Sequence, residues 1–107
     1  ALGGPALAPA PLPVVVGQAA RPLGLPAETV AALYLHAFAS ALVSAAVRFV
    51  PLGQTEGQAV LAALHPVILA VAARTAECEL HDLGSAAFGA DLAAMAHETL
   101  DVRIFRT

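Results

Sequence analysis

The residues that could carry out chemistry in this sequence are few and widely spaced. Cys78 is the single cysteine, so these 107 residues can form neither an internal disulfide nor a four-cysteine metal cluster, and a reducing compartment fits them best. No serine lies in a Gly-x-Ser-x-Gly turn, and the glycines at 53–57 lack the following lysine of a phosphate-binding loop. The sequence therefore predicts a protein that is not an enzyme and that holds no cofactor.

One pair of residues has the spacing of metal ligands. Cys78 and His81 stand at i and i+3, where two ligands can share one helix face. A four-coordinate metal needs more ligands than this pair supplies, so we expect an ordinary helix end and no metal site. A small metal-binding protein using Cys78 and His81 remains an alternative. His36 and His65, each alone among apolar residues, are expected to be hydrogen-bonded core or interface histidines.

Charge is scarce in this chain and apolar residues are abundant. Hydrophobic residues make up 59% of the sequence and charged residues 12%, which excludes disorder of the whole chain. The formal net charge of −3 excludes a nucleic-acid binder that relies on a basic face. Because the first residue is not methionine, we interpret the chain as a fragment or a trimmed form. Its surplus apolar surface is then expected to be covered by a missing part or by partners.

The chemistry-bearing residues must be positioned by helices, because the chain between its prolines is rich in alanine and leucine. Residues 1–13 hold four prolines and two glycines, which predicts an extended linker. Residues 14–23 favour a short helix over a strand, and Gly24 with Pro26 ends it.

Two long helices are predicted after Pro26. The first covers residues 27–50 and is stopped by Pro51. The second runs to about Leu80, with Thr55 as its N-cap and Gln58 completing a capping box. Pro66 lies inside it and should bend it near His65. Since a tight turn joins the two helices, they should form an antiparallel pair.

The C-terminal part is predicted to hold a loop over residues 81–89 and a short helix from an Asp91 N-cap to about Thr99. The remaining residues form a tail with apolar and cationic side chains together. The fold class is therefore all-α: a helical bundle with two long antiparallel helices, a short C-terminal helix and a docking tail. Its helical region spans residues 14–99 and its tail residues 100–107.

A membrane protein is the alternative that the apolar composition raises. Residues 30–47 are nearly long enough to cross a bilayer. The run is mostly alanine, however, and the second candidate span, residues 59–73, is short and contains both His65 and Pro66. We expect the helical hairpin of a soluble bundle, with an alanine-rich membrane hairpin as the alternative.

Three stretches of the sequence resemble one known family. They are PLPVVVGQAARPLGL (11–25), SAAVRFVPLGQTEGQAVLAAL (44–64) and DLGSAAFGADLAAMAHETLDVRIFRT (82–107). The last is the most specific, because a histidine-glutamate pair stands a few residues before an arginine-aliphatic-phenylalanine-arginine ending. Together they are similar to the C-terminal half of the urease accessory protein F family, UreF. The N-terminal half of that family has no counterpart in these residues.

The resemblance implies an all-helical, non-catalytic scaffold for nickel insertion into urease. Members of this family bridge the D-type urease accessory protein, also called H-type, and the G-type GTPase. They form homodimers of the bridged pair and meet the urease apoprotein through that complex. The implied location is the cytoplasm, with neither nucleic acid nor membrane as a partner.

The residues that match the family's motifs fall into two groups. Those expected to form a structural helix corner are Pro51, Leu52, Gly53, Gly57 and Gln58. Those expected to contact a partner are Arg48, Gln54, His97, Glu98, Arg103, Ile104, Phe105 and Arg106. The tail has too few neighbours in sequence to fold by itself, which suits ordering upon a partner. Its alternative role is a strap that closes the chain's own bundle.

Overall fold

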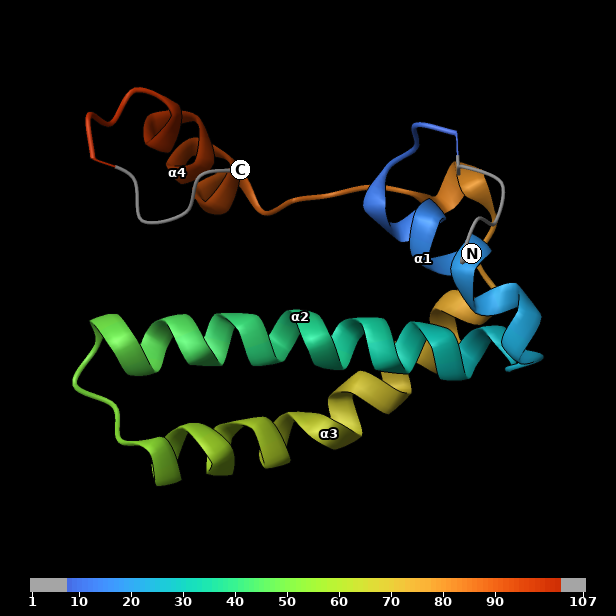
Figure 1. The fold of residues 1–107 in the computed structure, drawn as a ribbon, viewed down its shortest axis with the longest axis horizontal. Coiled ribbons are helices and arrows are strands. Elements are labelled where there is room, and N and C mark those ends of the chain that lie inside the picture. Colours follow the sequence, from blue (N-terminus) through green and yellow to red (C-terminus); the bar gives the residue numbers. More distant parts are fainter. Residues whose placement is uncertain (1–7, 103–107) are drawn as a thin grey trace, which may run out of the picture.

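The computed structural model describes residues 8–102, and every regular element in that part of the chain is a helix. The α-helices are α1 (Leu12–Ala20), α2 (Ala27–Phe49), α3 (Gln54–Ala76) and α4 (Phe88–Glu98), and short 3₁₀ helices follow α1 at Arg21–Leu23 and α3 at Leu80–Asp82 (Figure 1). The prediction of an all-α fold is confirmed. The predicted linker over residues 1–13 extends two residues too far, because Leu12 and Pro13 already belong to α1. Residues 1–7 lie outside the described residues.

The valine-rich segment after the prolines is helical, as favoured, and it begins at Leu12. Pro13 lies in the first turn, where a helix needs no amide donor. Gly24 follows with a φ of 63°, a left-handed conformation that glycine adopts without steric strain. This turn leads the chain from the first helical segment into α2.

Helix α2 ends within one residue of its predicted boundary. Glu28 lies in its first turn and Arg48 in its last, where each charge stabilises the helix macrodipole. Val50 is already extended, as expected for a residue that precedes a proline. The sequence signals at both ends of α2 therefore agree with each other and with the structure.

Helices α2 and α3 pack side by side as an antiparallel pair (Figure 1). The α3 side of this seam repeats every three or four residues, and its members are Gly57, Leu61, Leu64, Ile68 and Val71. Gly57 and Ile68 are buried and the other three are half-buried. A Cβ atom at Gly57 would lie 2.7 Å from Val47 Cγ2 and 3.3 Å from Val43 Cγ1. The missing side chain therefore lets the two helices approach closely.

The predicted start of α3 is wrong. Gly53, not Thr55, is the N-cap: its backbone is extended, and its N–H donates to the Glu56 carboxylate at 2.9 Å. The Gly53 carbonyl accepts the first helical bond from the Gly57 N–H, also at 2.9 Å. The carboxylate of Glu56 is charged and lies in the first turn, so it suits the positive end of the helix better than the amide of Gln58.

The cap contact can be tested by replacing its side chain. We expect Glu56→Ala to lower the free energy of unfolding by about 1 kcal/mol, because it removes both the hydrogen bond and the charge at the helix start. Gln58→Ala is the matched control and should change stability by only a few tenths. Urea unfolding followed by circular dichroism measures both. Equal losses for the two variants would contradict this account of the cap.

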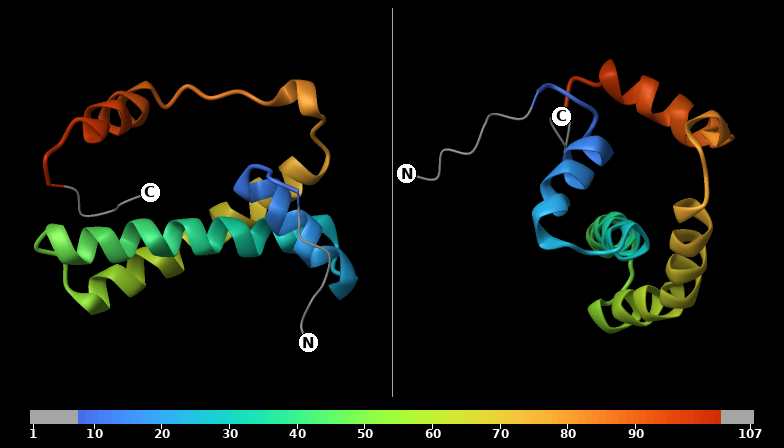
Figure 2. Two further views of the ribbon diagram at one scale, coloured as in Figure 1. Left: turned by 45° about the horizontal axis from the view of Figure 1, so that its top comes forward. Right: turned by 90° about the vertical axis from the view of Figure 1, so that its right-hand side faces the viewer.

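Helix α3 ends earlier than predicted, at Ala76 rather than about Leu80, and the Cys78 thiol donates back to the Arg74 carbonyl at 3.3 Å. Pro66 lies inside the helix, and α3 changes direction along its length (Figure 2). This agrees with the predicted bend, since proline removes one backbone hydrogen bond and crowds the preceding turn.

Helix α4 begins at Phe88, so the prediction of Asp91 as its N-cap is also wrong. The Asp91 N–H already makes a helical bond to the Ala87 carbonyl at 3.0 Å, which places the residue inside the first turn. Within the described residues, α4 packs against no other helix. Figure 1 shows it joined to the rest by a segment without helix.

The described residues enclose little core. Ile68 and Ala72 are the apolar residues that are buried. The accessible surface is 8893 Å² for a mass of 10.8 kDa, whereas a compact monomer of that mass exposes roughly 5500 Å². Large apolar side chains are exposed on every α-helix. The described residues therefore leave apolar helix faces exposed, as the composition predicts.

Candidate interaction surfaces

The helix corner places two of the predicted partner residues at one end of the hairpin. Arg48 lies in the last turn of α2 and Gln54 is the first residue of α3, and both are exposed. Between them Leu52 is half-buried, while Pro51 and Gly53 are exposed. The corner therefore leaves both side chains exposed at one end of the hairpin; their contact with a partner stays a prediction.

The other predicted partner residues lie at the end of α4 and beyond it. His97 is half-buried and Glu98 is exposed, both in the last turn. The structure does not bring them together with the helix corner, because α4 packs against neither α2 nor α3 within the described residues. The remaining predicted partner residues, Arg103, Ile104, Phe105 and Arg106, lie outside the described residues.

A row of exposed apolar side chains on α4 was not predicted as a site. We call it the α4 stripe: Phe88, Leu92 and Met95, exposed by 72%, 66% and 66%. Their spacing of i, i+4 and i+7 puts all three on one face of the helix. Two more exposed apolar residues, Leu100 and Val102, follow the helix. The same i, i+4, i+7 spacing can be read from the sequence alone.

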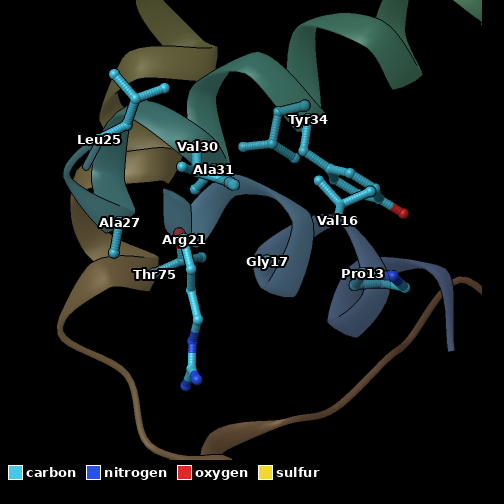
Figure 3. Close-up of a pocket in the computed structure, with 12 residues that line it drawn as sticks. Pro13, Val16, Gly17, Arg21, Leu25, Ala27, Val30, Ala31, Tyr34 and Thr75 are labelled. Carbon is cyan, nitrogen blue, oxygen red and sulfur yellow. The ribbon is translucent and has the colours of Figure 1, made fainter. Parts of the chain in front are cut away.

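A pocket of about 490 Å³ lies where α1 and the start of α2 meet the end of α3. Its lining is mainly apolar, with Val16 and Val30 among the residues that form it. Figure 3 shows the Tyr34 ring beside Val16, while the Arg21 side chain extends away from the ring. The pocket was not predicted from the sequence, because it forms where α1 folds back on the start of α2 and Thr75 of α3 closes it.

The two histidines of the hairpin meet each other in the seam. The ring centroids of His36 and His65 lie 5.4 Å apart with 24° between the ring planes. His36 Nδ1 is buried and has no hydrogen-bond partner among the described residues, so the expectation of a hydrogen-bonded histidine is wrong for this atom. Helical backbone groups around it are already paired with each other. His65 is exposed, so it is not a core histidine; a role at an interface stays a prediction.

The Cys78 and His81 pair does not share a helix face, because α3 has ended before Cys78. His81 instead lies between two carboxylates, with Nδ1 3.4 Å from Glu79 and Nε2 3.5 Å from Asp82. Nowhere in residues 8–102 are three or more histidine, cysteine or acidic side chains grouped to hold a metal ion. The geometry gives no support to the metal-binding alternative.

Helices α2 and α3 are both long and apolar enough to cross a membrane, with mean hydropathies of 1.8 and 1.7. Two such helices are weak evidence for a membrane protein, because length and composition alone pass this test.

The sequence comparisons agree on one family. The model of the UreF family matches residues 4–65, which is more than half of the chain. A urease accessory protein UreF from Cereibacter sphaeroides is 69% identical over the whole chain, which covers 51% of that relative. The UreF of Paracoccus denitrificans is 57% identical over the whole chain, with 50% of the relative covered. No solved structure gives a significant match.

This chain belongs to the UreF family of urease accessory proteins. It spans about half the length of the curated relatives it matches, and that half is the C-terminal one. The family predicted from the sequence motifs is confirmed. Membership in it does not favour a membrane hairpin or a small metal-binding protein.

Proposed function

We propose that this urease accessory chain is a non-catalytic, cytoplasmic scaffold that bridges the D/H-type accessory protein and the G-type GTPase while nickel is inserted into the urease apoprotein. The observation that carries the proposal is the detached α4, whose apolar face has no cover among the described residues. Covering the exposed apolar face of α4 with another protein would be favourable, and a scaffold acts through binding surfaces of this kind.

The length of α4 strengthens this argument. It has 11 residues, and an isolated helix shorter than about 12–15 residues is marginal in water. Helix-in-groove recognition uses apolar anchors at i, i+4 and i+7 on one face, which is the spacing of the α4 stripe. The D/H-type protein is therefore proposed to offer an apolar groove to α4 and to the tail that follows it.

The helix corner supports a second contact. Arg48 and Gln54 are exposed on the hairpin and do not belong to the α4 element. A scaffold that holds two proteins at once needs two such separate surfaces. The homodimer of the bridged pair is part of the same proposal, since the exposed apolar side chains of α2 could be covered by a second copy.

Co-purification tests the scaffold directly. A tagged D/H-type accessory protein, co-expressed with this chain, is expected to retain it through affinity and size-exclusion steps. Adding the G-type GTPase should then yield a complex that contains all three proteins. The proposal would be overturned if the chain did not co-elute with the D/H-type protein, and also if the G-type GTPase did not join the complex.

Removal of the tail should weaken the first of these contacts. Burying Ile104 and Phe105 against a partner contributes roughly 1.5–3 kcal/mol each before the entropy cost of ordering the tail. Deletion of residues 101–107 is therefore expected to raise the Kd for the D/H-type protein at least about tenfold, which equals roughly 1.4 kcal/mol. Calorimetry measures this affinity.

The same variant separates docking from intramolecular packing. Its helical content and melting temperature should equal those of the parent chain, because the deleted residues follow the last helix. An unchanged Kd would exclude the tail as a docking element. A sharp fall in melting temperature would identify it as the strap of the chain's own bundle.

A further inference from the structure

The pocket between α1, the start of α2 and the end of α3 has no part in the proposed scaffold. Its volume of about 490 Å³ falls within the range of roughly 300–1,000 Å³ that is usual for small-molecule sites. Val16 of α1 and Val30 and Leu35 of α2 belong to its wall, and all three are half-buried. Figure 3 shows the Tyr34 ring beside Val16. This wall suits an aliphatic group.

The lining of the pocket contains a single charged side chain, and its charge is positive. This residue is Arg21, and among the described residues no aspartate or glutamate belongs to the lining. The ion pairs within residues 8–102 all involve His81, so Arg21 has no carboxylate partner there. The hydroxyl of Thr75, another lining residue, already donates to the Ala72 carbonyl at 3.0 Å. Arg21 is therefore the group best placed to recognise an anionic end of a ligand.

The charged group and the aromatic ring mark two different parts of the pocket. The Arg21 side chain extends away from the Tyr34 ring (Figure 3), and Arg21 is exposed whereas Tyr34 is half-buried. A guanidinium binds a carboxylate through two parallel hydrogen bonds. An elongated molecule with an aliphatic body and a terminal carboxylate therefore matches both parts, because its charged end stays near water while its chain is covered.

We propose that this pocket binds a small aliphatic carboxylate, with its chain against Val16 and Val30 and its carboxylate on Arg21. The proposal goes beyond the scaffold function, since it gives the chain a small-molecule ligand of its own. Burial of the aliphatic chain supplies the affinity, and the arginine selects the sign of the ligand's charge. Because an exposed ion pair contributes little free energy, the preference for the anion is a matter of severalfold.

Tyrosine fluorescence follows binding at this pocket directly. Tyr34 is the single tyrosine of the chain, and the sequence has no tryptophan, so the emission comes from a residue of the pocket wall. Octanoate is the probe, and octylammonium, a similar chain with the opposite charge, is its control. We expect a saturable change in emission with octanoate and a Kd for octylammonium that is at least about threefold higher. Equal Kd values, or no saturable change with octanoate, would overturn the proposal.

Replacing the cation tests the charged end of the site. Arg21→Gln should raise the Kd for octanoate at least about threefold, whereas Arg21→Lys keeps the positive charge and should retain most of the affinity. Arg21 is exposed, so both variants are expected to fold. An Arg21→Gln chain that binds octanoate as tightly as the parent chain would contradict the assigned role of the arginine and with it the proposal.

Filling the pocket tests its apolar part. Gly17 belongs to the lining, and a Cβ atom there would meet nothing within 4 Å. Gly17→Leu should therefore occupy the space without disturbing α1, since leucine is also the better helix former. We expect its Kd for octanoate to rise at least about tenfold, with the helical content of the parent chain by circular dichroism. Unchanged binding in a normally helical Gly17→Leu chain would place the probe outside the pocket and refute the proposal.

Discussion

Replacing Gly57 with leucine is expected to lower the free energy of unfolding by about 3 kcal/mol or more, the largest stability effect of any single substitution proposed for this chain. Even the first atom of a side chain there would lie 2.7 Å from Val47 Cγ2. That distance is below any normal carbon–carbon contact, so α2 and α3 would have to separate. Urea unfolding followed by helical signal measures the loss.

The matched control is Gly17→Ala in α1. A Cβ atom at Gly17 would meet nothing within 4 Å, and alanine is favoured over glycine inside a helix by roughly 0.5–1 kcal/mol. This substitution should leave the chain equally stable or slightly more stable. A Gly57→Leu chain that unfolds at the same urea concentration as the parent would show that the close approach of α2 and α3 is not required.

The second large effect concerns binding. We expect Leu92→Asp to raise the Kd for the D/H-type accessory protein at least about 100-fold, equivalent to roughly 2.7 kcal/mol. Leu92 is the middle residue of the α4 stripe, and central apolar residues carry most of the energy of such contacts. The substitution both removes the apolar side chain and buries an unpaired charge. Calorimetry with the purified partner gives the Kd.

Ala90→Asp supplies the same charge on the opposite face of α4. It should change the Kd less than about threefold, since the helix start tolerates an acidic residue well. If both variants bind equally, the α4 stripe does not face the partner. If Leu92→Asp instead lowers the melting temperature strongly, α4 packs onto its own chain rather than into a partner's groove.

The sequence predicted the two long helices well because their signals are local and consistent. The prolines at 26 and 51 fix the ends of α2, and an apolar repeat marks the seam of α3. The helix caps were predicted poorly. Thr55 and Asp91 are good caps by residue type, but both lie inside their helices. Helix α3 is capped by Gly53, before Thr55, and α4 begins at Phe88, before Asp91. Cap choice depends on where the preceding turn ends, which sequence patterns specify only within a few residues.

Candidate sites were harder to predict than helices, for a physical reason. The His36 and His65 rings stack because α2 and α3 come together, and no local pattern in the sequence records that approach. The α4 stripe was readable from its spacing, yet only the structure reveals that nothing among the described residues covers it. The predicted partner residues 103–106 lie outside the described residues, so their role rests on the motif and on the binding experiments above.

The short turn between α2 and α3 also bears on the order in which the chain folds during synthesis. Four residues, 50–53, separate these helices, so forming the hairpin requires very little loop closure. Contacts of this local kind form within microseconds to milliseconds. A ribosome adds only about 5–20 residues each second. The hairpin can therefore be complete before α4, which follows it in the chain, has left the ribosome. The element that emerges after the hairpin packs against no other helix among the described residues, so it is exposed to other proteins as soon as it appears.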